Sequence, residues 1–294
     1  MATTLVQDAA ESSRRARRGP APGRLLIQVL VHGVVILFLL FMVLPFLWML
    51  STAFKERMAV FAVPPAWIPP HLTLDSFQQL LNLVPFGNFY LNSFKITACI
   101  TLGQLVFCSS AAYAFARLRF PGRNLLFGVY LSSLLVPGQV TIIPLYTIIK
   151  DLGLLDNHAA LILPAMTSAF GTFLLRQFFL TIPVELEEAA RVDGAGPFRI
   201  LSTIYMPLSG AALATLAIFT FNYFWNEFFR PLIFLSSLPN MTIPLGLAFV
   251  LGQYGSNQAM VMAGVTLAIA PVLVIYLFTQ RYMVEGITLT GLKG

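Results

Sequence analysis

Charged residues are scarce in this chain. Asp, Glu, Lys and Arg make up 10% of its 294 residues, against about a quarter in soluble domains. Hydrophobic residues make up 57% and the mean hydropathy is +0.80, which indicates an integral membrane protein. The net charge of +6 does not predict a nucleic-acid partner, because the basic residues form short clusters at the ends of apolar segments, without interleaved aromatic residues.

Cysteine and histidine are rarer still. Cys99 and Cys108 lie on opposite sides of one predicted helix, too far apart for a disulfide. The three histidines have no ligand spacing, so we expect no metal site. The chain also lacks a phosphate-binding GxxxxGK[ST] motif and any constellation of nucleophile and base. We therefore expect no enzyme activity and no bound cofactor, and any ATP and Mg²⁺ that drive the protein must be bound by another chain.

Six apolar runs are long enough to cross a bilayer as helices, for which about 20 residues suffice. The sequence thus predicts an all-α integral membrane protein with six transmembrane helices. The expected organisation is a tail over 1–24, a first span over 25–50, an extracytoplasmic segment over 51–90, a core over 91–281 and a tail over 282–294. The predicted spans are Leu25–Leu50, Leu91–Ala116, Leu125–Ile148, Ala159–Leu180, Ser209–Leu235 and Ala259–Thr279.

The distribution of Lys and Arg predicts the orientation. Of the 18 such residues, thirteen lie on the side that holds both termini and five on the other, and the excess places both termini in the cytoplasm. The N-terminal SSRRARR could precede a cleaved signal, but the following run of about 26 residues exceeds a signal core of 7 to 15. We therefore expect an anchor, with the arginines of the tail resting on membrane lipid.

The loop between the fourth and fifth spans, Thr181–Leu208, carries four of the twelve acidic residues. Pro183 and the glutamates after it favour the first turn of a helix, which we expect to end near Val192. Gly194 suits the left-handed residue that ends such a helix, and Gly196 with Pro197 suits the start of another. The sequence therefore predicts a helix-turn-helix on the cytoplasmic face of the membrane.

One face of the first loop helix has the composition of a docking element. Leu186, Ala189, Ala190 and Asp193 share a side by their spacing, and the small side chains let a partner approach closely. Glu185 and Glu188 offer carboxylates to basic groups on that partner. The alternative is an interfacial helix without a partner, but such helices usually carry Lys and Arg on their polar face.

Two polar groups within the spans are candidates for a solute path. The small and polar side chains on one face of the second span serve either helix packing, which we favour, or pore lining. On the fifth span Asn222, Trp225 and Asn226 share a predicted face and Glu227 adjoins it, a set that suits either sugar hydroxyls and sugar faces or contact with a partner permease. The stripe on the second span consists of Ser93, Thr97, Thr101, Gln104 and Cys108.

Several motifs resemble one family of transporters. EAARVDGAG in the loop, with MPL after a gap, resembles the EAA loop of membrane subunits of bacterial binding-protein-dependent ABC importers. ALATLAIFTFNYFWNEFFRPLIFL and QRYMVEGITLTGLKG are similar to the carbohydrate-uptake branch, in particular to the smaller of the two maltose-type permease subunits. The resemblance covers the chain from the first span onward.

This resemblance implies a function for the loop. Glu188, Ala189, Ala190, Asp193 and Gly194 match the signature of a coupling helix that sits in a cleft of an ATPase subunit, and the C-terminal tail would also reach toward the ATPase dimer. A polar residue is frequent in relatives at the position of Gly196.

The implied assembly lies in the bacterial plasma membrane. It contains an ATPase dimer that binds ATP and Mg²⁺, a second permease subunit and an extracytoplasmic solute-binding protein. A heterodimeric permease core is expected, with a homodimer as the alternative, and solute crosses by alternating access. The solute is a sugar, a polyol or glycerol phosphate.

A secondary carrier is the alternative function, but it would usually need charged residues near the centres of the spans, which are nearly free of charge.

Overall fold

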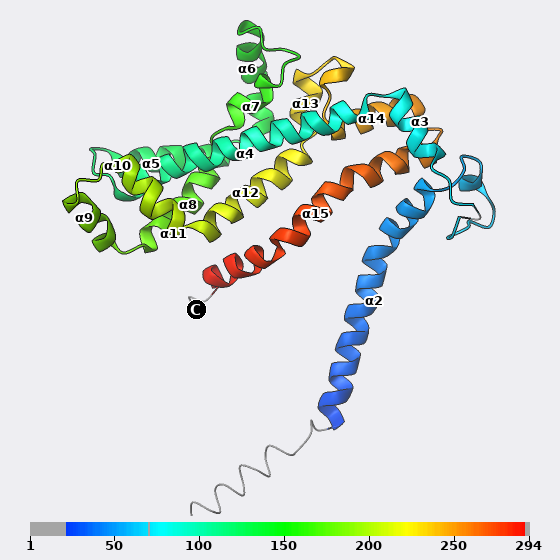
Figure 1. Cartoon of the computed structure of the whole chain (residues 1–294), viewed down its shortest axis with the longest axis horizontal. Coiled ribbons are helices and arrows are strands. Elements are labelled where there is room, and N and C mark those ends of the chain that lie inside the picture. The colour runs from blue at the N-terminus through cyan, green and yellow to red at the C-terminus, as the bar shows by residue number, and fades with distance from the viewer. Residues whose placement is uncertain (1–21, 70, 292–294) are drawn as a thin grey trace, which may run out of the picture.

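The computed structural model describes residues 22–69 and 71–291, with side chains for 26–69, 71–274, 276 and 277. Every regular element within these ranges is a helix (Figure 1). Short 3-10 turns occupy Ala59–Phe61, Ser133–Leu135 and Leu238–Asn240, and a π-helical turn occupies Leu201–Tyr205. The α-helices are α2 (Pro22–Ala53), α3 (Asp75–Leu83), α4 (Phe86–Arg117), α5 (Arg123–Ser132), α6 (Gly138–Asp151), α7 (Ala159–Ala165), α8 (Ala169–Thr181), α9 (Val184–Val192), α10 (Pro197–Ile200), α11 (Met206–Leu208), α12 (Gly210–Trp225), α13 (Phe229–Phe234), α14 (Ile243–Tyr254) and α15 (Gln258–Gly291).

Candidate membrane spans account for much of this helical structure. Three segments, Leu26–Ala53, Phe86–Arg117 and Ala159–Thr181, are long and apolar enough by themselves, and two bent pairs of helices bring the number to five. The described apolar part of α15, Gln258–Val274, is shorter than a full span, although the helix itself continues to Gly291. The finding is therefore a multi-span helical protein, and the count of six stays a prediction.

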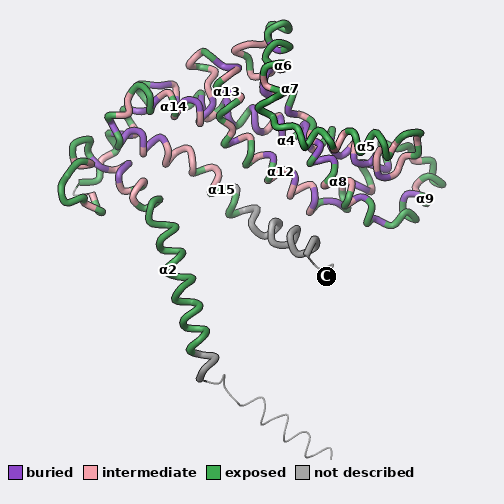
Figure 2. The backbone as a smooth tube through the Cα atoms, turned by 180° about the vertical axis from the view of Figure 1, so that it is seen from behind, coloured by how far each residue is buried: buried purple, intermediate pink, exposed green. Residues whose placement is uncertain are grey.

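The first span lies apart from the rest of the protein. α2 crosses the view as a separate rod, and its residues are exposed over nearly its whole length (Figures 1 and 2). Its apolar side chains face outward because lipid, rather than protein, is their solvent. α2 contacts the rest of the protein near its C-terminal end. There Lys55 is buried with its Nζ 3.9 Å from the centroid of the Trp48 ring, which packs on Trp67.

α4 is the central helix, and it packs against α7, α8, α12 and α14. The polar stripe predicted on it is used for these contacts, as the packing interpretation expected. Ser93 Oγ accepts a hydrogen bond from Ile243 N, and the buried side chain of Gln104 bonds to Ala165 O and to Thr220. Cys108 Sγ lies 3.5 Å from Ser168 O. Thr97 is fully buried, but its hydroxyl and that of Thr101 have no hydrogen-bond partner among the described residues, so Ser93, Gln104 and Cys108 are the members of the stripe whose polar atoms bond to other helices or their flanking residues.

The predicted third, fourth and fifth spans are not single helices. The third, Leu125–Ile148, bends by 101° between Leu135 and Gly138, since Pro137 cannot continue the first helix and begins the next. The fourth is divided into α7 and α8 at Met166–Ser168. The fifth, Ser209–Leu235, ends as a helix at Trp225, and α13 follows as a separate turn. The break in the third span lies among exposed residues, whereas Ala165 and Ala169, on either side of the break in the fourth, are buried.

The loops after α6 and after α13 are tied together by Asp156. Its carboxylate accepts hydrogen bonds from Ser236 N at 2.9 Å and Ser237 N at 3.0 Å, and its own N–H donates to Phe234 O. Hydrogen bonds from Ser237 hold the pKa of the Asp156 carboxyl down to about 2. This contact joins two chain segments about eighty residues apart, on the side of the protein from which α6, α7 and α13 project (Figure 1).

Close packing of α4 on α14 requires a glycine at position 246. A Cβ added there would lie 2.3 Å from the Phe89 ring, which is fully buried, whereas a Cβ at Gly252 in the same helix meets nothing within 4 Å. We expect Gly246→Ala to lower the free energy of unfolding by roughly 1–3 kcal/mol. Gly252→Ala, the matched control, should be neutral or slightly stabilising, because alanine favours helix. Thermal denaturation of the detergent-solubilised protein measures both, and equal effects would contradict this packing argument.

Candidate functional site

The loop between α8 and α12 folds as its sequence predicts. α9 spans Val184–Val192, directly after Pro183. Gly194 has φ of +80°, and the N–H groups of Gly194 and Ala195 donate to carbonyls of the last turn of α9. α10 then begins at Pro197. A left-handed glycine and a proline therefore set the angle between the two helices, as expected from their backbone preferences.

A buried carboxylate ties α9 to the transmembrane helices. The side chain of Glu187 is 4% exposed. Its Oε1 accepts hydrogen bonds from Tyr113 Oη on α4 at 3.2 Å and from Arg191 at 2.6 Å, and its Oε2 accepts one from Tyr205 Oη at 2.7 Å. The hydrogen bond to Glu187 raises the pKa of the Arg191 guanidinium. Elements from three parts of the chain thus converge on one carboxylate, which we call the Glu187 clamp.

Arg117 extends this connection to the end of α8. From the last turn of α4 its guanidinium donates to the carbonyl oxygens of Phe179 and Ile182, and it lies 5.4 Å from the centroid of the Tyr205 ring. These carbonyls belong to the end of a helix, where backbone acceptors lack partners within the helix. The ends of α4 and α8, α9 and the π-helical turn therefore form one packed unit, whose core includes Leu175, Phe179, Ile200 and Tyr205.

The opposite face of α9 is open. Glu185, Glu188, Ala189 and Asp193 are exposed and Ala190 is partly buried. Two large apolar side chains beside them, which the sequence analysis did not select, are also exposed, Val192 to 88% and Phe198 to 82%. Such apolar exposure beside acidic groups is typical of a surface that another protein covers. Val192 ends α9 and Phe198 lies in the first turn of α10, and no local pattern in the sequence distinguishes them from nearby core residues such as Ile200.

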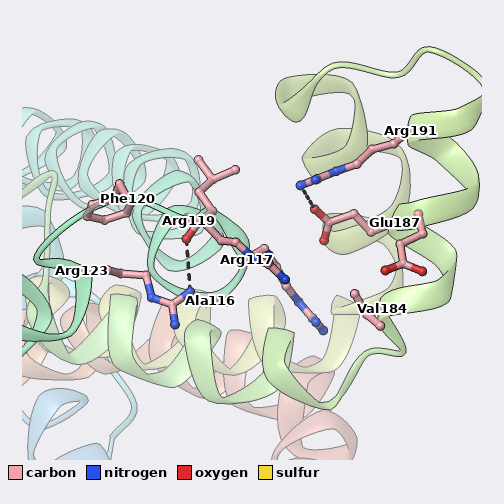
Figure 3. A pocket seen from close by; sticks show the side chains of 10 residues that line it. Ala116, Arg117, Arg119, Phe120, Arg123, Val184, Glu187 and Arg191 are labelled. Atoms are coloured by element: carbon pink, nitrogen blue, oxygen red, sulfur yellow. Dashed lines mark hydrogen bonds and ion pairs between the residues drawn. The ribbon is translucent and has the colours of Figure 1, made fainter.

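A hollow separates α9 from the turn between α4 and α5 (Figure 3). Its volume is about 820 Å³. In the close view, Arg117 extends from the end of α4 toward α9, where Arg191 pairs with Glu187. The hollow is lined by Ala116, Arg117, Leu118, Arg119, Phe120, Arg123, Val184, Glu187, Glu188 and Arg191.

A second cavity, of about 510 Å³, opens between α7, α8, α12 and α13. Of the predicted path residues, Gln104 is part of its wall. Arg230 also lines it and is paired with Glu227 at 3.6 Å, so the cation is largely neutralised. The other lining residues include aromatic, small polar and apolar types: Phe170, Phe219, Tyr223 and Phe224; Thr167, Ser168 and Thr220; and Leu134, Pro164, Ala165 and Leu216.

The cluster predicted on the fifth span is divided. Trp225 is buried, stacks on Phe221 and donates from Nε1 to Ala268 O of α15. Asn222 and Asn226 are exposed, and the Asn226 amide donates to the Asn222 side chain at 2.9 Å. Asn222 and Asn226 therefore share a face, as predicted, whereas the inclusion of Trp225 on that face is wrong, because its ring packs into the bundle while the amides remain outside it.

Comparison with known proteins identifies the family. Residues 104–286, more than half of the chain, match the family described as binding-protein-dependent transport system inner membrane component. The chain belongs to this family. It is a transmembrane permease subunit, a role that agrees with its several apolar helices, and membership places it among multi-pass inner-membrane proteins.

Relatives with assigned names support the same family. The permease is 36% identical to the sn-glycerol-3-phosphate transport system permease protein UgpE of Escherichia coli (strain K12), over 89% of this chain and 96% of that protein. It is 37% identical to the arabinooligosaccharides transport system permease protein AraQ of Halalkalibacterium halodurans, over 77% and 81% respectively. A crystal structure of a bacterial ABC transporter involved in the import of the acidic polysaccharide alginate has a chain with a TM-score of 0.81 at 24% identity, covering 90% and 99%.

The left-handed glycine of the permease loop can be tested by itself. At Gly194 an added Cβ meets no atom within 4 Å, so Gly194→Ala changes only the backbone preference. We expect a loss of about 1 kcal/mol in the stability of the loop, and a measurable fall in transport because α9 is tilted. Gly196→Ala, at φ of −77°, is the matched control and should be tolerated. Solute uptake at equal protein level measures both, and equal activities would refute the requirement.

Proposed function

We propose that this permease forms half of the translocation pathway of a sugar importer and couples ATP hydrolysis by a partner subunit to alternating access. The observation that carries the proposal is the two-sided character of α9. Its inner side is fixed to α4 and the π-helical turn by Glu187, and its outer side exposes Glu188 and Val192, with Phe198 exposed on the neighbouring α10. A helix fixed on one side and open on the other can pass a displacement from a docked protein to the spans.

In the proposed topology α9 and both termini lie in the cytoplasm and six helices cross the membrane. The charge distribution of the sequence supports this orientation. The bent pairs α5–α6 and α10–α12 would each count as one span, and α15 as the sixth. The loops joined by Asp156 would then lie outside, where an extracytoplasmic solute-binding protein docks.

The proposed solute is a sugar or a related polyol. Relatives are named for sn-glycerol 3-phosphate and for arabinooligosaccharides, and a similar structure belongs to an alginate importer. The cavity of about 510 Å³ offers aromatic faces together with hydroxyl and amide groups, which suits sugar rings and their hydroxyls. We propose that a second permease subunit, in a heterodimeric core, supplies the other wall, and that an ATPase dimer with ATP and Mg²⁺ docks at α9.

The mechanism follows from differential contacts. The ATPase dimer can bias the inward-facing against the outward-facing state only by holding α9 differently in its open and closed forms. Closure would move α9 together with α8 and the π-helical turn as one unit, because Arg117 and the Glu187 clamp join these elements. The spans that carry the cavity walls, α8 and α12, are connected to that unit through the chain.

The test is gentle purification of the tagged full-length permease from its native membranes, followed by identification of co-purifying proteins by mass spectrometry. We expect an ATPase, a second permease subunit and a solute-binding protein, and uptake of labelled sugar by vesicles that contain the complete set and ATP. Recovery of the chain alone from several detergents and with the tag at either end would overturn the coupling proposal. ATP-independent uptake driven by an ion gradient would favour a secondary carrier.

A further inference from the structure

We propose that the hollow between the α4–α5 turn and α9 binds the headgroup of an anionic phospholipid, whose acyl chains lie along α5. The inference goes beyond the proposed transport function, and it needs only membership of the membrane family. It is carried by two observations: an excess of unpaired guanidinium groups inside the hollow, and an exposed apolar strip that continues from its rim.

The first observation is the charge of the hollow. Four arginines and two glutamates line it, and the carboxylate of Glu187 is already taken by Arg191 and two tyrosines. Arg123 donates only to the carbonyl oxygen of Leu118, at 3.1 Å. Arg119 is exposed and has no bonded partner among the residues that the structure describes. The hollow therefore offers several N–H donors and net positive charge to a phosphate group.

The turn itself brings these groups together. Gly122 has φ of +75° and precedes the first residue of α5, so the chain reverses tightly and Arg119 and Arg123 line the same opening. Arg117 approaches from the end of α4, and its Nε is buried without a partner. Among the described residues, Arg117, Arg119 and Arg123 form no ion pair with either glutamate of the hollow, so these three guanidinium groups repel one another, and a bound phosphate would remove that repulsion.

The second observation distinguishes a lipid from a soluble anion. Leu125 lines an opening that adjoins the hollow, together with Arg119 and Arg123. From there the exposed face of α5 continues with Leu126 and Val129, and these three side chains are 73%, 53% and 62% exposed. A charged pocket followed by an apolar strip matches a headgroup followed by acyl chains. Basic pockets at the cytoplasmic ends of spans recognise anionic headgroups in this way.

An acidic surface of the ATPase is the rival occupant. It would satisfy the arginines, but it would leave the strip of Leu125, Leu126 and Val129 without a function. The hollow also lies between α9 and the turn that precedes the candidate span formed by α5 and α6. The lipid therefore accounts for both observations, and the protein partner accounts for one.

The experiment is a binding titration of the purified, delipidated full-length permease, with whatever subunits accompany it, against phosphatidylglycerol and phosphatidylcholine carrying identical chains. We expect tighter binding of phosphatidylglycerol. The double variant Arg119→Gln/Arg123→Gln should weaken that binding by about 30-fold. The control Arg57→Gln/Arg199→Gln removes the same charge from exposed sites outside the hollow and should bind as the unmodified protein does.

A second measurement locates the chains. Phosphatidylglycerol with a photoactivatable group in its acyl chain should label the peptide that contains Leu125, Leu126 and Val129, and excess phosphatidylglycerol should compete for the labelling. Equal binding of both lipids, equal loss in the control variant, or labelling elsewhere would overturn the proposal. Loss of the ATPase from the Arg119→Gln/Arg123→Gln complex, with lipid binding intact, would assign the hollow to the protein partner instead. Lipid binding is measured in the absence of ATP. A failure to bind lipid can therefore be distinguished from a failure of ATP-driven transport.

Discussion

Glu188→Arg should remove the ATPase from the purified complex and abolish ATP-driven uptake, by a hundred-fold or more. Glu188 is exposed on α9, beside the apolar side chains of Val192 and Phe198 that we expect a partner to cover. Reversal of a charge inside a complementary interface costs several kcal/mol, since like charges are brought together and desolvated; each 1.4 kcal/mol is a factor of ten in affinity. Co-purification and vesicle uptake measure the two effects.

The control for this variant is Glu56→Arg, which makes the same charge change at an exposed glutamate in the segment before α3. It should retain the ATPase. Glu188→Gln should give an intermediate loss, because it removes the attraction without adding repulsion. Retention of the ATPase by Glu188→Arg at the level of the unmodified permease would contradict the docking role of α9, even if transport fell.

Glu187→Ala should separate docking from coupling. The exposed face of α9 remains, so the ATPase should still bind, whereas uptake per ATP hydrolysed should fall at least ten-fold because α9 is no longer fixed to α4. Two buried tyrosine hydroxyls lose their acceptor, which costs about 1–3 kcal/mol for each buried group left without a partner. Thermal denaturation should therefore also show clear destabilisation. The ratio of uptake to ATP hydrolysis in vesicles is the decisive measurement.

Removal of one tyrosine hydroxyl at a time should reduce coupling by smaller, graded amounts. Tyr205→Phe should cost more than Tyr113→Phe, since the hydrogen bond of Tyr205 to Glu187 is 2.7 Å and that of Tyr113 is 3.2 Å. Both variants should retain a higher ratio of uptake to ATP hydrolysis than Glu187→Ala, because in each of them the other tyrosine and Arg191 still donate hydrogen bonds to the Glu187 carboxylate. Normal coupling in Glu187→Ala, with only reduced stability, would limit Glu187 to a role in folding.

The loop was predictable because its signals are local. Proline, glutamates at a helix start and Gly194 act within a few residues, and α9 begins and ends where these residues place it. The burial of Glu187 was not predictable in the same way. Its partners Tyr113 and Tyr205 lie 74 and 18 residues away, and nothing local separates Glu187 from its exposed neighbours Glu185 and Glu188 apart from the i,i+4 spacing to Arg191.

The structure of the spans was likewise only partly predictable from local sequence. Hydrophobic runs locate apolar chain but do not show where a helix ends, so the end of α12 at Trp225 differs from the prediction. The bend between Leu135 and Gly138 coincides with Pro137, a residue that is expected to kink a helix. Helical periodicity placed Trp225 with Asn222 and Asn226, whereas Tyr90 and α15 provide a site for its ring. Packing between distant segments decides the placement of the Trp225 ring, and the sequence pattern of one span contains no information about its neighbour.

The π-helical turn at Leu201–Tyr205 makes the length of this segment as important as its composition. A π turn holds one more residue than an α turn, and one residue corresponds to about 100° of rotation. Loss of a single codon there would turn Tyr205 away from Glu187 while leaving each neighbouring helix intact. For a genome annotator or a protein engineer, these five positions are ones at which the spacing is fixed even where side chains can vary.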